Sequence, residues 1–383
     1  MEQGSTPMLE QIHSLPQMVR ECLPSFSEAV EAALPAMLCS SISSFYLTGC
    51  GDSYMAAVGA ELAFHTLAGI PTRALTALHF SRYTVPFVFN PRHTAVIGIS
   101  VSGEVARTVE ALRLARKAGA ITIAATGAPQ SRVASSADVL LRTTVPPPHT
   151  QVPTPGVRSY IASLLMLYLA AIRVGEARGF LSPTAAAAAH DELAEGAEWM
   201  ATTIETNAAA IQRLVGQWSD AGEFVFVGGG PNYGTALFSA AKVLEASGDS
   251  ALGQDTEEWA HLQYFAREQA TPTFIIDAGG RSNSRAREIA VAARTIGRRV
   301  VAIVPHGESA ISAHAESVLP VHGRVREAFS PLVYCLAGML FADYRAQLLG
   351  ESYFQSFGGG RSMEGGGGIS RIQTSALQEE MTP

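Results

Sequence analysis

The chain has 383 residues, of which 47% are hydrophobic and 16% are charged, so it has room for two domains with sizeable cores. Its formal net charge of −7 argues against non-specific binding to nucleic acid. Four cysteines show no metal-ligand spacing, and the first residues have neither a basic start nor an apolar run. We therefore expect reduced thiols, no metal, no signal peptide and a cytoplasmic protein that binds neither nucleic acid nor membrane.

The first half of the chain begins with a predicted helix over residues 8–23, interrupted at Pro16. Strands and helices then alternate. Strands are predicted at 45–48, 72–78 (an edge strand), 94–100, 121–125 and 139–143, and helices from the turn at 49–54 to about residue 68 and at 105–118. This alternation is typical of parallel βαβ units with helices on both faces of the sheet.

The second half repeats the alternation after a Pro-rich loop at 145–155. The apolar run 161–172 is cut by Arg173 and is too short to span a bilayer, so it predicts a core helix within 159–175. Further helices are predicted at 184–216, 232–246 and 331–349, strands at 224–227, 272–277, 300–305 and 317–321, and a flexible Gly-rich end.

A sequence pattern recurs along the chain. Gly49-x-Gly-x-x-Tyr54 returns 179 residues later as Gly228-x-Gly-x-x-Tyr233, and the next strand–helix–strand run returns at an offset of 178. Two copies of one α/β domain are therefore expected. The predicted division is an N-terminal helical segment (1–35), a first domain (36–205), a second domain (206–350) and a Gly-rich C-terminal tail (351–383).

Lys242 and Glu245 lie three residues apart on a predicted helix and so share one face. Of the 27 basic residues only Lys117 and Lys242 are lysines, which suggests that a guanidinium would not serve at Lys242. A surface ion pair is the ordinary alternative, but the helix is mostly apolar and favours a functional pair. His261 follows on a second short helix, capped by Asp255 or Thr256. The segment 248–255 before it is expected to be a connection long enough to let His261 reach away.

Three serines cluster at predicted strand ends in the first copy only. Their counterparts in the second copy are not hydroxyls, so the scaffold does not require Ser53, Ser100 and Ser102. Helix N-termini and turn amides favour anions, and ligands of open α/β sheets bind at the carboxyl ends of the strands. The cluster predicts an anion pocket, whereas helix capping is the alternative for Ser53 and Ser102. The turns match neither a dinucleotide fingerprint nor a Walker motif.

Taken together, these motifs resemble a known family. The segment MLEQIHSLPQ is similar to its opening M-x-x-E-I-x-x-Q-P. The segments GCGDS (49–53), SVSGE (100–104), PGVRS (155–159) and AKVLE (241–245) resemble its motifs GCGTS, SQSGE, IGVAS and LKLKE. The chain resembles the double sugar-isomerase (SIS) domain proteins, most closely the isomerase half of the glucosamine-6-phosphate synthases. The similarity covers nearly all of the chain, and the order and spacing of the motifs make it specific.

The resemblance implies a fold, a dimer and residue roles. It implies two tandem SIS domains, each a parallel sheet flanked by helices, in a homodimer with shared active sites. The implied substrate-binding residues are Gly51, Ser53, Ser100, Val101, Ser102, Val157 and Ser159. Glu245 would move the proton between C1 and C2, Lys242 would assist at the sugar oxygens, and His261 of the neighbouring subunit would open the ring.

The chain departs from the family pattern near the anion. Val101 and Val105 replace a Gln and a Thr, Asp52 replaces a Thr, and the C-terminal Lys of the family is absent. Arg158, Arg281 or Arg371 would compensate, or the anion would differ from phosphate, for example a sulfonate. No glutaminase domain precedes the motifs in this sequence, which favours a glutamine-independent enzyme.

The expected function is therefore that of a cofactor-free aldose–ketose isomerase, or of an amino-sugar isomerase and deaminase. Its substrate would be a sugar with a terminal phosphate or similar anion, which reacts through an enediol or enediolamine. A deglycase of fructosamine-type phosphates, a sulfosugar isomerase and a non-catalytic sugar-phosphate sensor are the alternatives.

Overall fold

The chain folds into two compact units in a computed structural model that describes residues 5–147, 152–362 and 368–380. Within these residues, the first-sheet unit comprises Arg20–Pro146, Ser159–Leu193 and Phe357–Pro383. The second-sheet unit comprises Met1–Val19, Pro147–Arg158 and Ala194–Ser356. Neither unit is one continuous stretch, because three long helices run from one unit into the other: α1 (Pro7–Ala33), α7 (Arg158–Ala177) and α8 (Pro183–Gln217).

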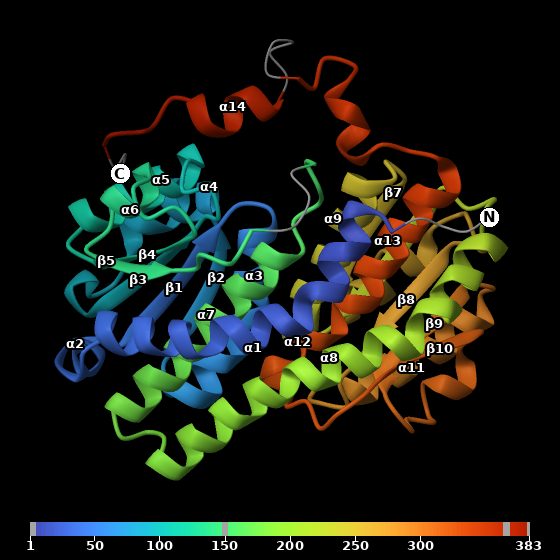
Figure 1. Ribbon diagram of the computed structural model, residues 1–383, viewed down its shortest axis with the longest axis horizontal. Helices are drawn as coiled ribbons and strands as arrows, with labels where there is room; N and C mark the ends of the chain where they lie inside the picture. The colour runs from blue at the N-terminus through green and yellow to red at the C-terminus, as the bar shows by residue number, and fades with distance from the viewer. Residues whose placement is uncertain (1–4, 148–151, 363–367, 381–383) are drawn as a thin grey trace. The chain divides into compact units, whose positions relative to one another are not determined.

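The first-sheet unit is built on five parallel strands in the order β2-β1-β3-β4-β5 (Figure 1). The strands are β1 (Ser44–Gly49), β2 (Thr72–Thr76), β3 (Thr94–Ile99), β4 (Ile121–Thr126) and β5 (Val139–Arg142). Every residue of β3 is buried, as expected for a central strand covered on both faces. Gly49 is in register with Ile99, so β1 and β3 end at the same level and their following loops are neighbours.

Besides parts of α1, α7 and α8, the unit contains further helices. They are α2 (Ala36–Ser41), α3 (Asp52–Ala63), α4 (Ala77–His79), α5 (Ala106–Lys117), α6 (Arg132–Ser135) and α14 (Gly368–Thr374), with π-helical turns at Phe64–Ala68 and Phe80–Thr84 and 3-10 turns at Val85–Phe87 and Pro91–His93. The apolar side of α5 packs with Val96 and Ala124 in one core cluster. The predicted helix ending near residue 68 is therefore α3 continued by a π-helical turn.

Helix α7 confirms the predicted core helix. Among the described helices it alone is long and apolar enough, by length and composition, to cross a membrane. However, 83% of its apolar window is buried inside the protein, and Leu164, Leu165 and Met166 are fully buried. The apolar side chains of α7 are thus buried by contacts within the protein, as in the core helix of a globular fold.

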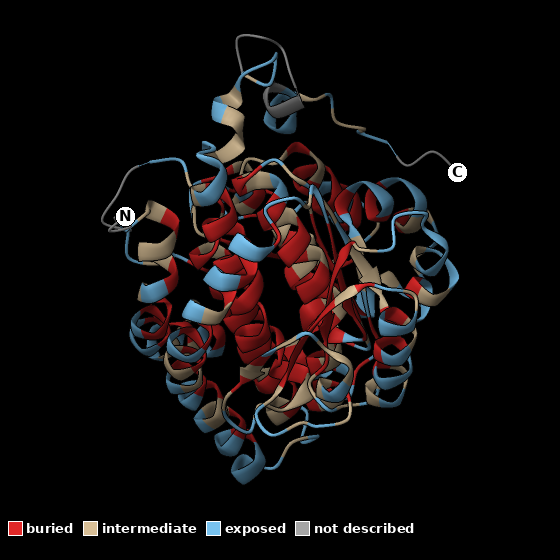
Figure 2. Ribbon diagram, turned by 90° about the vertical axis from the view of Figure 1, so that its right-hand side faces the viewer, coloured by how far each residue is buried: buried red, intermediate tan, exposed pale blue. Residues whose placement is uncertain are grey.

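The second-sheet unit repeats the strand order of the first, as β10-β9-β8-β6-β7, again all parallel (Figure 1). The strands are β6 (Glu223–Gly228), β7 (Ser250–Asp255), β8 (Pro272–Ile276), β9 (Arg299–Pro305) and β10 (Ser317–Val321). Buried residues lie on the central strands of the sheets and on long stretches of helix, and exposed residues lie on other helices and on loops (Figure 2). The predicted α/β fold with two parallel sheets is confirmed.

The helices of this unit include α9 (Pro231–Ala246), α10 (Thr256–His261), α11 (Asn283–Thr295), α12 (Pro331–Tyr334) and α13 (Leu336–Leu349). Short 3-10 turns lie at Gln263–Phe265, Ser312–His314, Glu327–Phe329 and Tyr353–Phe357. The helix predicted over 331–349 is divided at Cys335, which separates α12 from α13.

Two sequence predictions are wrong here. The segment 248–255, predicted to be a free connection, contains β7, which pairs with β6 along its length. Its edge position and half-exposed side chains leave no strong apolar alternation to reveal a strand. The interruption predicted at Pro16 is also absent, because α1 continues from Pro7 to Ala33 and buries Met8, Ile12 and Val19.

Glu110 on α5 is a buried carboxylate that joins three segments of the first-sheet unit. It accepts hydrogen bonds from Ser81 Oγ (2.9 Å), Arg82 Nε (3.0 Å), Arg107 (2.5 Å) and the backbone N–H of Gln378 (2.6 Å). Burial acts to raise the pKa of Glu110, but these hydrogen bonds and the charge of Arg107 outweigh it and hold the pKa below its usual range. The carboxylate is therefore ionised while the protein is folded at neutral pH.

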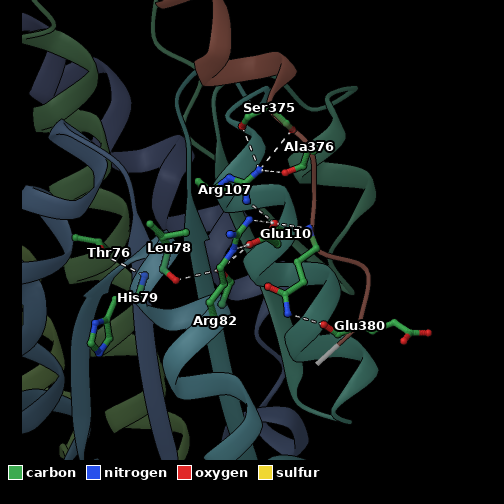
Figure 3. Close-up of polar contacts among 11 residues, drawn as sticks. Thr76, Leu78, His79, Arg82, Arg107, Glu110, Ser375, Ala376 and Glu380 are labelled. Atoms are coloured by element: carbon green, nitrogen blue, oxygen red, sulfur yellow. Dashed lines mark hydrogen bonds and ion pairs between the residues drawn. The ribbon is translucent and has the colours of Figure 1, made fainter. Parts of the chain in front are cut away.

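The C-terminal segment 373–380 lies against α5 through this network. Figure 3 shows Arg82 and Arg107 directed at Glu110, and Arg107 also bonds Ser375 and the carbonyl of Ala376. Leu377 packs against the core cluster of the sheet. A flexible end was predicted from the glycines at 358–360 and 365–368; residues 363–367 lie outside the described part, but the last described residues are docked.

Candidate active site

The turn after β1 begins the candidate anion pocket in the first-sheet unit. Gly51 has φ +54°, and a side chain added there would meet nothing within 4 Å, so the left-handed backbone rather than crowding favours glycine. Ser53 follows in the first turn of α3 and is 8% exposed. The turn therefore presents a hydroxyl and helix N-terminal amides at the carboxyl edge of the sheet.

The loop after β3 lies beside this turn. A side chain on Gly49 would come within 3.0 Å of both Ser53 and the carbonyl of Ile99, so the two strand ends are in close contact. Ser100 is 1% exposed, and its Oγ has no hydrogen-bond partner among the described residues. Val101 and Ser102 are exposed at the tip of the loop. A buried hydroxyl without a hydrogen-bond partner destabilises the fold, so a ligand that accepts a hydrogen bond from Ser100 Oγ would remove this penalty.

Helix capping does not account for these serines. The N-cap of α3 is Gly51 and that of α5 is Val105, and neither helix has a side-chain cap. Ser102 instead accepts the backbone N–H of Glu104 within the loop, at 3.3 Å. The alternative reading of Ser53 and Ser102 as N-caps is therefore wrong.

Lys242 and Glu245 are joined on α9 of the second-sheet unit. Lys242 is fully buried, and its Nζ lies 2.5 Å from Oε2 of Glu245 and 4.9 Å from the centre of the Phe238 ring. The Glu245 side chain is 31% exposed. A buried ammonium beside a partly accessible carboxylate is unlike a surface ion pair, so that alternative does not describe the geometry.

His261 ends α10 in the same unit and is 65% exposed at the side chain. Its Nε2 lies 3.0 Å from Oε1 of Glu257, which also pairs with Arg285. The hydrogen bonds from Arg285 and His261 lower the pKa of Glu257. The imidazole therefore stands on the surface of its unit, held by a carboxylate.

The remaining predicted residues have varied surroundings. Val157 is fully buried, and Ser159 is half-buried at the start of α7. Arg158 bonds Ser14 Oγ at 2.5 Å, and Arg281 forms an ion pair with Glu327 at 2.5 Å, while Arg371 is exposed on α14. Arg158 and Arg281 thus already have partners within their own unit.

The predicted site residues belong to both units. Gly51, Ser53, Ser159 and the loop 100–104 are in the first-sheet unit, and Lys242, Glu245 and His261 are in the second-sheet unit. Chemically, the first group offers hydroxyls and backbone amides to an anion, and the second offers a carboxylate, a cation and an imidazole for proton transfer. Among the residues that the structure describes, no group of three or more His, Cys, Asp or Glu is arranged to hold a metal ion.

One polar residue of this region escaped the sequence analysis. Arg132, at the start of α6, forms an ion pair with Glu104 of the loop at 2.7 Å. The two are 28 positions apart, so no helical or strand spacing connects them. Only the capping serine at 131 marks the start of α6 in the sequence.

Comparisons with known proteins agree with this architecture. Residues 39–173 match the SIS domain family. Glutamine–fructose-6-phosphate aminotransferase (isomerizing) of Tropheryma whipplei is 29% identical over 353 residues, covering 88% of this chain and 55% of the relative. The same enzyme of Gloeobacter violaceus is 27% identical over 347 residues, with the same coverage. The chain thus spans about half the length of the curated relatives it matches.

Solved structures share the fold at low identity. The C-terminal domain of glucosamine-fructose-6-phosphate aminotransferase from Francisella tularensis has a TM-score of 0.79 at 18% identity and covers 91% of this chain and 97% of that one. Tagatose-6-phosphate ketose/aldose isomerase from Escherichia coli gives 0.73 at 15%, with 93% and 97% covered. Glucosamine-6-phosphate deaminase from Thermotoga maritima gives 0.67 at 18%, with 91% and 96% covered. Residues 39–173 thus match the SIS domain family, and the relatives and the common fold agree with the family resemblance of the motifs.

Proposed function

We propose that the chain is an aldose–ketose isomerase acting on a sugar with a terminal phosphate or similar anion. The observation that carries this proposal is the contact between buried Lys242 and Glu245. A buried ammonium is expensive to desolvate, and the carboxylate beside it stays partly accessible. Such a pair suits a reaction in which a base moves a proton next to a developing negative charge.

In the proposed reaction the carboxylate of Glu245 removes the proton from one of the two carbons C1 and C2 and returns it to the other. The enediolate formed between these steps carries negative charge on oxygen, which the ammonium of Lys242 stabilises. His261, a titratable group, opens the sugar ring by proton transfer at the ring oxygen. The hydroxyl proton moves between the oxygens on C1 and C2, and the proton on Glu245, whose side chain is 31% exposed, exchanges with solvent in part of the turnovers before a proton is delivered to the product.

The anion of the substrate is proposed to bind in the first-sheet unit. Ser53, Ser100 and Ser102 supply hydroxyls, and the backbone N–H groups at Gly51 and Val101 supply further donors. The unpartnered Oγ of Ser100 supports this assignment. Val157 and Ser159 are proposed to line the sugar, and Arg371 is proposed as a further anion contact.

The relatives supply the substrate class. Their descriptions name fructose-6-phosphate, tagatose-6-phosphate and glucosamine-6-phosphate as what those proteins act on. A terminal phosphate on a six-carbon sugar is the common element. One description names a deaminase, which favours amino-sugar isomerisation with release of ammonia as the second candidate. We propose that the present residues act without glutamine.

Two residues favour an altered anion. Val101 is 41% exposed where the family pattern has a Gln, and Asp52 adds a negative charge in the first turn of α3. A monoanionic sulfonate would be repelled by Asp52 less than a phosphate dianion would. A sulfosugar is therefore included among the substrates to be tested.

We further propose a cytoplasmic homodimer whose sites are shared, built from two copies of one domain with the division 1–35, 36–205, 206–350 and 351–383. The exposure of His261 supports a role at a neighbouring subunit. The identical strand orders, and the matched turns at Gly51 (φ 54°) and Gly230 (φ 55°), support the duplication.

The proposal is tested by incubating the purified protein in deuterated water with sugar phosphates, sulfosugars, amino-sugar phosphates, fructosamine phosphates and the matching neutral sugars. We expect proton exchange at C2 and interconversion of an anionic aldose and ketose, with no turnover of the neutral sugar. Release of a free amine from the fructosamine phosphates would instead show a deglycase. Binding without exchange or turnover would show a sensor and overturn the proposal.

A further inference from the structure

The anion loop, residues 100–104, provides no side-chain cap for α5 and is hydrogen-bonded to other parts of its unit. Ser100 N–H donates to the carbonyl of Ala125, and Gly127 N–H donates to the carbonyl of Val101 at 3.2 Å. The N–H of Val133 donates to the carbonyl of Gly103 at 2.9 Å. The loop is thus fixed to β4, to the turn after β4 and to α6.

Gly103 shows how closely the two segments approach. Its φ is +68°, and a side chain there would collide with the hydroxyl of Ser131, the residue that caps α6. The short helix α6 therefore lies directly against the loop. A change in the position of α6 would move the loop and the backbone amides that it presents.

Arg132 supplies the polar part of this attachment. Its Nε lies 2.7 Å from Oε2 of Glu104, its backbone N–H donates to Oε1 of the same carboxylate, and its second terminal nitrogen donates to the Glu104 carbonyl at 2.6 Å. The hydrogen bonds from Arg132 lower the pKa of Glu104. One arginine thus holds both the side chain and the backbone at the end of the loop.

The same guanidinium also reaches the C-terminal segment. The terminal nitrogen that binds the Glu104 carbonyl also donates to the carbonyl of Gln373 at 2.7 Å. Gln373 lies in α14. Arg132 therefore links two parts of the first-sheet unit that are far apart in sequence, the anion loop and the docked end of the chain.

We propose that Arg132 is a positioning residue of the anion pocket: it holds loop 100–104 in the conformation that binds the terminal anion of the substrate. This inference rests on the proposed function. Its physical basis is preorganisation, because amides fixed in place before binding need no ordering when the anion arrives. The contacts of Arg132 are to Glu104 and Gln373, so the role proposed for it is exerted through the loop.

The test compares Arg132→Gln and Arg132→Lys with a matched control, Arg116→Gln. Arg116 lies in the last turn of α5, and its Nε is 2.9 Å from Oδ1 of Asp138. The side chains of this ion pair and of the Arg132–Glu104 pair are exposed to a similar extent. Hydrogen–deuterium exchange of the amides at 100–104 is measured without substrate. KM and kcat are then measured with the anionic sugar that the wild-type protein turns over, and thermal unfolding reports the fold.

We expect Arg132→Gln to speed exchange in the loop and to raise KM on the order of tenfold, with kcat changed less than about threefold. Arg132→Lys should have a KM between those of the wild type and Arg132→Gln. An ammonium can make one of the bonds to Glu104 but cannot bind its carboxylate and its carbonyl together as the guanidinium does. Arg116→Gln should match the wild type in both measurements.

Amide exchange, kinetics and thermal unfolding together separate the possible failures. Unchanged exchange in Arg132→Gln overturns the positioning role whatever the activity. Faster exchange with an unchanged KM shows that Arg132 does hold the loop but that the loop does not bind the anion, which contradicts the proposed anion pocket. A loss of thermal stability equal in the Arg132→Gln and Arg116→Gln variants, with equal KM, overturns any special role of Arg132.

Discussion

Replacing Lys242 by methionine separates catalysis from stability. The structure shows a fully buried ammonium that contacts a carboxylate and an aromatic ring. If Lys242 stabilises an enediolate, Lys242→Met should lower kcat by on the order of a hundredfold or more, as for the removal of one oxyanion donor. The same variant should change the stability of the fold only moderately, because methionine keeps an unbranched stem in the buried space.

The expected change in stability follows from opposing effects at the ammonium. Moving it out of water costs several kcal/mol. The charge-assisted hydrogen bond to Glu245 stabilises the folded protein by about 1.5–3 kcal/mol. The cation–π contact with the ring of Phe238 adds about 2 kcal/mol. Glu245 is 31% exposed and can be hydrated when Lys242 is absent. We therefore expect the free energy of unfolding to change by less than about 2 kcal/mol.

Urea denaturation and turnover of the anionic sugar are the two assays for this variant. Arg299→Met is a suitable control, because it replaces another basic residue by methionine. The ion pair that it removes, between Arg299 and Asp220, includes no residue of the proposed site. A large loss of stability with turnover intact would show that Lys242 serves the fold and would refute the assignment. A gain in stability with lost turnover would support it strongly, since stability is commonly sacrificed at active sites.

Three further predictions follow from the structure. Ser102→Ala should raise KM for the anionic sugar more than it lowers kcat, which steady-state kinetics would detect; equal effects on both would argue against a binding role. Because the pKa of Glu110 is lowered in the folded protein, its contribution to stability is present above about pH 4.3 and is lost as the pH falls through the folded-state pKa. Urea midpoints at pH 7 and pH 3 should therefore differ less in Glu110→Gln than in the wild type, and an equal difference would contradict the network. His261→Asn and Glu245→Gln proteins, refolded as an equal random mixture, should regain about a quarter of wild-type site activity if the site is shared; no recovery in confirmed heterodimers would contradict sharing.

Much of the fold was predictable because buried parallel strands leave a strong pattern. The runs at 95–99 and 224–228 carry no polar side chain and are flanked by glycine or polar residues, and both belong to interior strands. β7 was missed because an edge strand with exposed side chains and two glycines nearby has the pattern of a connection. The continuation of α1 through Pro16 was missed because burial of its apolar side outweighs the local preference of proline.

Some residues of the candidate site could be recognised from the sequence and others could not. Serines and a Lys–Glu pair at characteristic spacing were recognisable from the sequence because local motifs contain them. Burial of Lys242 followed from the apolar helix around it. Arg132 was not recognisable, since its partner Glu104 and the carbonyl of Gln373 are brought to it only by the tertiary fold. Contacts of this kind have no sequence period.

The central claim is that Glu245 transfers the proton between C1 and C2 of an anionic sugar. The most direct measurement is deuterium incorporation at C2, followed by NMR, for the wild type, Glu245→Gln and the control Glu316→Gln, whose carboxylate pairs with Arg294. We expect exchange in the wild type and the control, and a loss on the order of a hundredfold or more in Glu245→Gln, because an amide cannot accept the proton. Exchange at the wild-type rate in a folded Glu245→Gln protein would contradict the proposed role of Glu245.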